Sequence, residues 1–133
     1  MKLKSIYTSV IAALALTAVA HAAHAQDIKL GYNGDLSASP SAQSGQAAVL
    51  GMEAAIADIN AAGGVLGRKL TLVTRDDTSA PPRSIQNMSD LIDRENVVAV
   101  FGPTNSGNAM AWKHIANQKK ICLLYTSPSP RDS

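Results

Sequence analysis

The sequence predicts an α/β protein in which a parallel sheet carries helices on both faces. Segments with the two-residue period of strands alternate along the chain with segments that have the 3.6-residue period of helices. No tight-turn pair joins two strands as in a hairpin, and Val97–Phe101 is an unbroken apolar run, which is typical of a strand buried on both faces. Together these observations favour parallel strands joined by right-handed helical crossovers.

The first half of the chain supplies two strands and one helix. Apolar residues alternate over Asp27–Tyr32 and again over Lys69–Arg75, which predicts a strand at each place. The period between them becomes helical over Ser44–Ala62, and Gly63-Gly64 suits the end of that helix. The apolar stripe that we expect this helix to bury consists of Val49, Met52, Ile56 and Ile59.

The second half repeats the alternation. Pro81-Pro82 begins a helix that ends near Glu95, because proline lacks the N–H group that a first turn leaves unpaired. Val97–Phe101 is the third strand, a third helix is expected from about Asn108 to Gln118, and Ile121 would begin a fourth strand. The expected buried positions are Ile85, Met88, Leu91 and Ile92 in the second helix and Met110, Trp112 and Ile115 in the third.

Both ends of the chain differ from the segment between them. Residues 1–25 carry two lysines, an apolar run and the small-residue pattern Ala23-His24-Ala25, which predicts a secretory signal peptide. The run is shorter than the roughly 20 apolar residues of a membrane span, and no Cys follows the cleavage site to carry a lipid. Residues 122–133 read as the in-frame translation of a transposase-type sequencing adapter, so we expect native sequence to end near Ile121. The alternative is a disordered tail rich in Pro and Ser.

The expected folded segment is electrically neutral. Residues 26–121 contain nine Lys or Arg and nine Asp or Glu, so no basic surface is expected for nucleic acid or an anionic membrane. The one cysteine of the chain is Cys122, in the suspected tail. We therefore expect no disulfide, no cysteine-based metal centre and no thiol nucleophile.

The carboxyl ends of parallel strands are where such sheets bind ligands. This rule selects three loops, and the one at Gly102–Gly107 leads into a helix. The amides of Asn105 to Asn108 and the Ser106 hydroxyl would face an anion there, and charge-assisted bonds of about 1.5–3 kcal/mol each suffice for a carboxylate. The alternative is that Ser106 or Asn108 only caps the helix.

Other chemistry is less well supported by the sequence. The run Gly102–Ala109 approaches a phosphate-binding P-loop, but Asn108 replaces the required Lys and Ala109 replaces the Mg²⁺-binding hydroxyl. Asp76 and Asp77 are neighbours on a strand and point to opposite faces, so we expect them to make turns and caps rather than to share a metal ion. No cofactor, metal or catalytic residue is expected, and nothing argues for an enzyme.

Four stretches resemble the periplasmic leucine/isoleucine/valine-binding proteins of ABC transporters. They are Ile28–Ser37, Gly51–Leu70, Asp76-Asp77 and Val97–Ser106, and the resemblance extends over nearly all of residues 26–121. It implies two Rossmann-like lobes that close on a solute, of which this chain holds the N-terminal part of the first, without the hinge or second lobe. It also implies a periplasmic protein, monomeric at full length, that presents an amino acid or amide to a membrane permease.

The resemblance also implies site residues. Ser106 aligns with the residue that binds the solute's α-carboxylate, so Asn105, Ser106 and Gly107 form the expected cradle. Ser44 stands where many relatives have an aromatic wall of the side-chain pocket, and the loop before Gly45 is longer and more polar. Amides, urea, hydroxy acids and aromatic acids therefore stay open beside branched-chain amino acids. The alternative functions are a ligand-sensing domain of a receptor or regulator and an exported enzyme on a Rossmann-like sheet.

Overall fold

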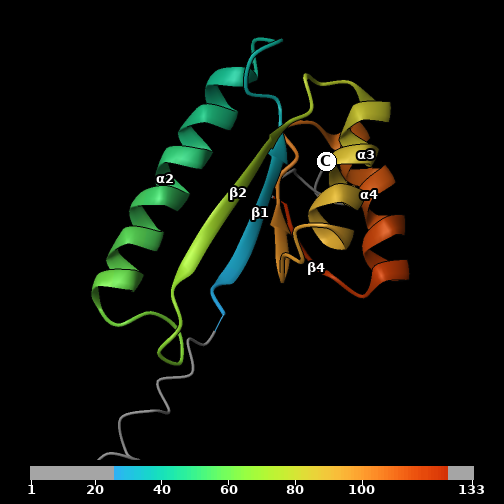
Figure 1. The fold of residues 1–133 in the computed structure, drawn as a ribbon. Coiled ribbons are helices and arrows are strands. Elements are labelled where there is room, and N and C mark those ends of the chain that lie inside the picture. Colours follow the sequence, from blue (N-terminus) through green and yellow to red (C-terminus); the bar gives the residue numbers. More distant parts are fainter. Residues whose placement is uncertain (1–25, 126–133) are drawn as a thin grey trace, which may run out of the picture.

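The computed structural model describes residues 26–125, which form a parallel sheet with helices on both faces, as predicted (Figure 1). The strand order is β2-β1-β3-β4. The strands are β1 (Ile28–Gly34), β2 (Leu70–Asp76), β3 (Ala99–Phe101) and β4 (Cys122–Leu124). β1 pairs with β2 along its whole length, and its residues Leu30 to Tyr32 pair with β3. The predicted signal peptide, residues 1–25, lies outside the described residues.

The helices divide between the two faces of the sheet. They are α2 (Ala42–Ala61), α3 (Pro81–Asp93) and α4 (Ser106–Lys119). Figure 1 shows α2 on one side of the sheet and the pair α3 and α4 on the other. The connection through α2 leads from β1 to β2, whereas the connection through α4 leads from β3 to β4 in the opposite direction. The chain thus reverses its winding between β1 and β3, and their carboxyl ends form the switch point where open α/β sheets bind ligands.

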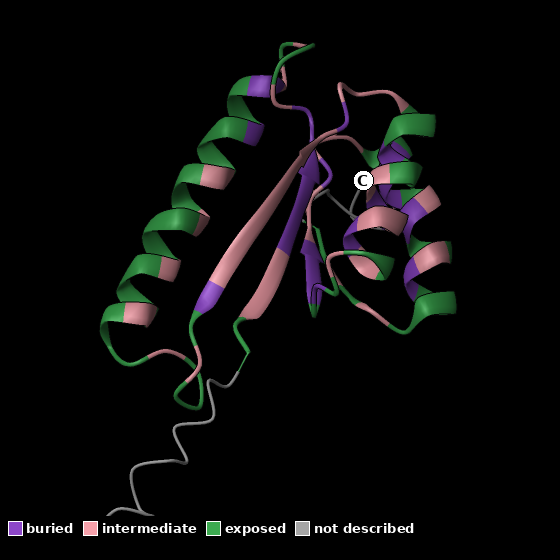
Figure 2. Cartoon of the chain, in the orientation of Figure 1, coloured by how far each residue is buried: buried purple, intermediate pink, exposed green. Residues whose placement is uncertain are grey.

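The core lies between the sheet and the α3–α4 pair. Figure 2 shows the buried residues concentrated in the central strands and on the inner faces of these two helices. α2 is different, because only Ala42 and Gly45 of that helix are buried. Its expected stripe is half-buried at Val49, Met52 and Ile56, and the prediction that Ile59 is buried was wrong. The residues of the core cluster are Met88, Leu91, Val97, Val100, Trp112 and Ala116.

Two further burial predictions were wrong. Met110 is 66% exposed, because it lies two residues, about 200° around the helix, from the fully buried Trp112. The buried face of α4 is instead made of Asn108, Ala109, Trp112 and Ala116. In α3, Ser84 takes the inward position beside Met88, and Ile85 is exposed. A polar residue is tolerated there because it is fully hydrogen-bonded, as described below.

The fourth strand begins one residue later than expected. β4 starts at Cys122 and pairs in parallel with β3, from Ala99↔Cys122 to Phe101↔Leu124. Its three residues belong to the stretch 122–133 that we predict to be non-native, and that origin stays a prediction. Within residues 26–125, no helix combines the length and the apolar character that crossing a membrane requires.

Candidate functional site

The loops that follow β1 and β2 are tied together by Asp35 and Asp76. The Asp76 carboxylate accepts hydrogen bonds from the Leu36 amide at 3.0 Å, the Ser37 hydroxyl at 2.6 Å and the Thr78 amide at 2.9 Å. Burial alone would raise the pKa of Asp76, but these three bonds outweigh it and lower the pKa below its ordinary value. The carboxylate therefore stays ionised and fixes the two loops against each other.

Asp35 is the second tie between the same loops. Its carboxylate accepts hydrogen bonds from the Ser39 hydroxyl, from the Ala38 and Ser37 amides at 2.8 and 3.1 Å, and from the Ser79 hydroxyl at 2.9 Å. The Ser39 hydroxyl and then the Ala38 amide hold the pKa of Asp35 far below its usual range, although burial opposes them. Asp35 therefore anchors the loop that leads into α2 and joins it to the β2–α3 loop.

Asp77 points away from Asp76 and enters the space between α3 and α4, as expected of neighbouring residues at a strand end. It is fully buried. One carboxylate oxygen accepts from the Ser79 amide at 2.9 Å, which is the turn-making role predicted from the sequence. The other accepts from the Ser84 hydroxyl at 2.8 Å and from the Asn108 side-chain amide at 2.9 Å. Sequence reasoning did not find this second set, because its partners are distant along the chain.

Two glycines allow the site's backbone segments to approach closely. Gly102, at the end of β3, has a φ of 111° and lies against Asn33, whose carbonyl oxygen a Cβ at Gly102 would overlap. Gly45, in the first turn of α2, lies in the same way against the carbonyl oxygen of Asp35. The first turn of α2 and the β3–α4 loop are therefore both held directly beside the carboxyl end of β1.

The first turn of α4 is capped by Asn105. Its side-chain oxygen accepts from the Asn108 amide at 2.9 Å, and its carbonyl oxygen accepts from the Ala109 amide at 3.3 Å. The alternative that Ser106 or Asn108 is the capping residue was therefore wrong, and the Asn108 amide is not free for a ligand. Ser106 and Gly107 are exposed, and their amides have no protein acceptor within residues 26–125. This turn can accordingly offer two amides and one hydroxyl to an anion.

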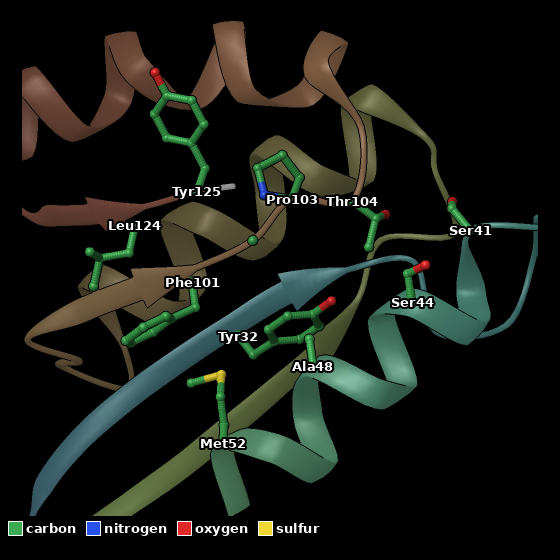
Figure 3. A pocket seen from close by; sticks show the side chains of 11 residues that line it. Tyr32, Ser41, Ser44, Ala48, Met52, Phe101, Pro103, Thr104, Leu124 and Tyr125 are labelled. Carbon is green, nitrogen blue, oxygen red and sulfur yellow. The ribbon is translucent and has the colours of Figure 1, made fainter. Parts of the chain in front are cut away.

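A pocket of about 520 Å³ lies on the α2 side of the same edge (Figure 3). Ser44, Ala48 and Met52 project from one face of α2 toward it, Tyr32 comes from β1, and the β3–α4 loop supplies the opposite wall. Of the four predicted site residues, only Ser44 lines this pocket. Asn105, Ser106 and Gly107 lie at the neighbouring start of α4. The remaining lining residues are Ser41, Phe101, Gly102, Pro103, Thr104, Leu124 and Tyr125.

Tyr32 was not singled out by sequence reasoning. The strand alternation placed it on one face of the strand with Ile28 and Leu30, but gave no sign that its hydroxyl would be buried without a hydrogen-bond partner. Burial, and then the negative charges of Asp77 and Asp35, raise the pKa of Tyr32 above its usual value. Its hydroxyl is therefore a neutral group at physiological pH. Among residues 26–125 no three His, Cys, Asp or Glu side chains are grouped as metal ligands.

A parallel sheet with polar loops at its switch point and a pocket beside them defines an α/β ligand-binding lobe. The chain belongs to the periplasmic binding protein family, whose family model matches residues 27–133. The resemblance noted in the sequence is thereby confirmed at the level of the family.

Curated relatives agree with this assignment. The chain is 40% identical over 111 residues to Leu/Ile/Val-binding protein homolog 7 of Brucella suis biovar 1. This alignment covers 84% of the chain and 26% of the relative. The chain is 32% identical over 124 residues to the Leu/Ile/Val/Thr-binding protein of Salmonella typhimurium. This second alignment covers 93% of the chain and 32% of the relative. The chain thus spans about a quarter to a third of the length of these relatives.

Solved structures show the same fold. The branched-chain amino acid transporter substrate-binding protein LivJ of Streptococcus pneumoniae, in complex with isoleucine, superposes with a TM-score of 0.70 at 30% identity, over 77% of this chain and 30% of that one. A solute-binding protein of an ABC transporter from R. palustris, in complex with 4-hydroxybenzoate, gives a TM-score of 0.67 at 30% identity, over 74% of this chain and 26% of that one.

Proposed function

We propose that this chain is the N-terminal part of the solute-binding protein of an ABC transporter. It would capture a branched-chain or related amino acid, or an amide, in the periplasm and present it to a membrane permease without chemical change. The family to which the chain belongs and the names of its relatives support this proposal. A second lobe, outside this chain, would close over the loops at the carboxyl edge of the sheet.

The observation that carries the proposal is the exposed first turn of α4. Ser106 offers a hydroxyl and, with Gly107, two backbone amides that have no protein acceptor among the described residues. The solutes in two related structures, isoleucine and 4-hydroxybenzoate, differ in shape, but both contain a carboxylate. A helix N-terminus that offers amides and a hydroxyl suits that shared group.

The pocket beside α2 would receive the rest of the solute. Ala48, Met52 and Phe101 give it an apolar lining, and Ser44 and Thr104 are hydroxyl-bearing residues of the same lining (Figure 3). A solute that extends from the first turn of α4 past Thr104 would have its carboxylate at α4. The rest of the molecule would lie in the pocket on the α2 side of the sheet. A lining with both apolar and hydroxyl-bearing residues agrees with the wider range of solutes that was left open because Ser44 replaces an aromatic residue.

Ser106→Ala in the full-length protein tests this proposal. Titration calorimetry with L-leucine, L-isoleucine, L-valine, L-threonine, 4-hydroxybenzoate and acetamide first identifies a solute. For a bound carboxylate, the variant should lower affinity roughly 10- to 100-fold, because one charge-assisted hydrogen bond is lost. Ser89→Ala, on α3 away from this edge, is the matched control and should leave affinity unchanged. Equal affinities for the Ser106→Ala variant and the wild type would refute the role of Ser106.

A further inference from the structure

We infer that Asp77 is a positioning residue, which holds the first turn of α4 in its binding orientation through the side chain of Asn108. The inference rests on the proposed function, because it assigns this role to the turn that would bind the solute's carboxylate. Asp77 itself is fully buried and does not line the pocket. Its effect on the solute would therefore be transmitted through α4.

The contact joins parts of the site that the sheet keeps apart. Asp77 follows β2, and β1 separates β2 from β3, which leads into α4. The carboxylate of Asp77 nevertheless reaches the Asn108 side-chain amide at 2.9 Å and the Ser84 hydroxyl at 2.8 Å. The Ser84 hydroxyl in turn accepts from the Trp112 ring nitrogen at 2.9 Å. α4 is thus held at two points one turn apart, by groups that belong to the β2–α3 loop and to α3.

The bond to Asp77 is the one hydrogen bond that the buried side chain of Asn108 makes among the described residues. Asn108 directly follows Ser106 and Gly107 in α4, and it is buried. Its side-chain nitrogen donates to Asp77, while its side-chain oxygen has no hydrogen-bond partner. Without the Asp77 acceptor, neither end of this buried amide would be paired, and the cost of burying it would favour rotation or displacement of the turn. The orientation of the two exposed amides would change with it.

Substitution of Asp77 would remove both its charge and its hydrogen bonds, and these two losses predict opposite effects on the affinity for an anionic solute. A carboxylate near the start of α4 repels an anionic solute, so the removal of the charge alone would strengthen binding. Asp77→Leu keeps roughly the size of the side chain but removes every acceptor, so the bonds from Ser79, Ser84 and Asn108 are all lost. The Asn108 side chain then has no partner, so a positioning role predicts weaker binding although the charge is gone.

The experiment compares Asp77→Leu with Asp93→Leu in the full-length protein. Asp93 is the matched control, because it carries the same charge but bonds Lys119 in the last turn of α4, at the opposite end of that helix from the proposed site. Affinity for L-isoleucine is measured by calorimetry, and hydrogen exchange is measured for peptides that cover the first and last turns of α4. We expect Asp77→Leu to lower affinity about 10-fold or more and to speed exchange in the first turn only. Asp93→Leu should change affinity less than about threefold.

Asn108→Ala tests the same contact from its other end if Asp77→Leu does not fold. It keeps the backbone bond to the Asn105 side chain and leaves Asp77 with two donors, Ser79 and Ser84. It should give the same loss of affinity and the same faster exchange.

The two measurements separate the possible errors. Unchanged exchange in the first turn of α4, or tighter binding by Asp77→Leu, overturns the positioning role. Faster exchange with unchanged affinity shows that this turn does not bind the solute, which overturns the proposed cradle and the role derived from it. If the wild type does not bind isoleucine, isoleucine is excluded as its solute, and the exchange data still decide whether Asp77 holds the turn.

Discussion

Two glycines of α2 should respond in opposite directions to the same substitution. A Cβ at Gly45 would overlap the backbone carbonyl oxygen of Asp35, whereas a Cβ at Gly51 meets nothing within 4 Å. Both positions lie in the helix, so alanine gains about 0.5–1 kcal/mol of helix propensity at each. At Gly51 this gain stands alone, and Gly51→Ala should stabilise the protein by that amount. At Gly45 the overlap must be relieved by moving backbone, because neither partner is a flexible side chain.

Relieving such an overlap costs typically about 1–3 kcal/mol, and a contact between backbone atoms lies at the upper end of this range. Since the helix-propensity gain is common to both variants, it cancels when they are compared. Gly45→Ala should therefore be less stable than Gly51→Ala by about 3 kcal/mol, and less stable than wild type by about 2 kcal/mol.

Urea unfolding of the two variants in the full-length protein, without solute, measures this difference. The Gly45 variant should also bind solute more weakly, because the first turn of α2 carries Ser44 into the pocket. Equal stabilisation by both substitutions would show that α2 does not approach the end of β1 as closely as described, and would refute the reasoning.

Three further predictions concern the buried network, the acid response and the exposed surface. Ser84→Ala should lower the free energy of unfolding by about 1–3 kcal/mol, since the Trp112 ring nitrogen loses its acceptor; chemical denaturation followed by tryptophan fluorescence measures it, and an unchanged midpoint would contradict it. Asp35 has a depressed pKa in the folded state, so its contribution to stability is complete above its unfolded value of about 4 and is lost as the pH falls toward the folded value. Asp35→Asn should therefore be less stable at neutral pH but lose less stability between about pH 5 and pH 2 than wild type does, and parallel pH profiles of the melting temperature would argue against this. The 133-residue chain produced alone should self-associate, because Val98 is 52% exposed and β2 and β4 are open sheet edges; Val98→Lys should reduce this association in sedimentation experiments, and a monomeric chain that melts cooperatively would count against it.

The position of the candidate site was proposed from local sequence pattern, whereas the hydrogen bonds within it could not be predicted in that way. The period of apolar residues predicted each strand and helix and hence a parallel sheet, whose carboxyl edge is a general ligand-binding place. The loop before α4 was identified in this way. Which residue caps that helix depends on backbone angles, and Asn105, whose extended conformation lets its side chain reach the Asn108 amide, takes the role that was considered for Ser106 or Asn108.

The sequence by itself determined the order and type of the elements and the family of the protein, and it pointed to the edge of the sheet at which we propose that a solute binds. Periodicity, turn residues and a specific helix sequence are local signals, so they can be read without the fold. Only the tertiary structure decided that Asp77 meets Asn108, that Asp35 meets Ser79 and that the Tyr32 hydroxyl is buried without a partner. The two contacts join residues far apart in the chain, and all three features exist only once the helices and loops are packed against the sheet.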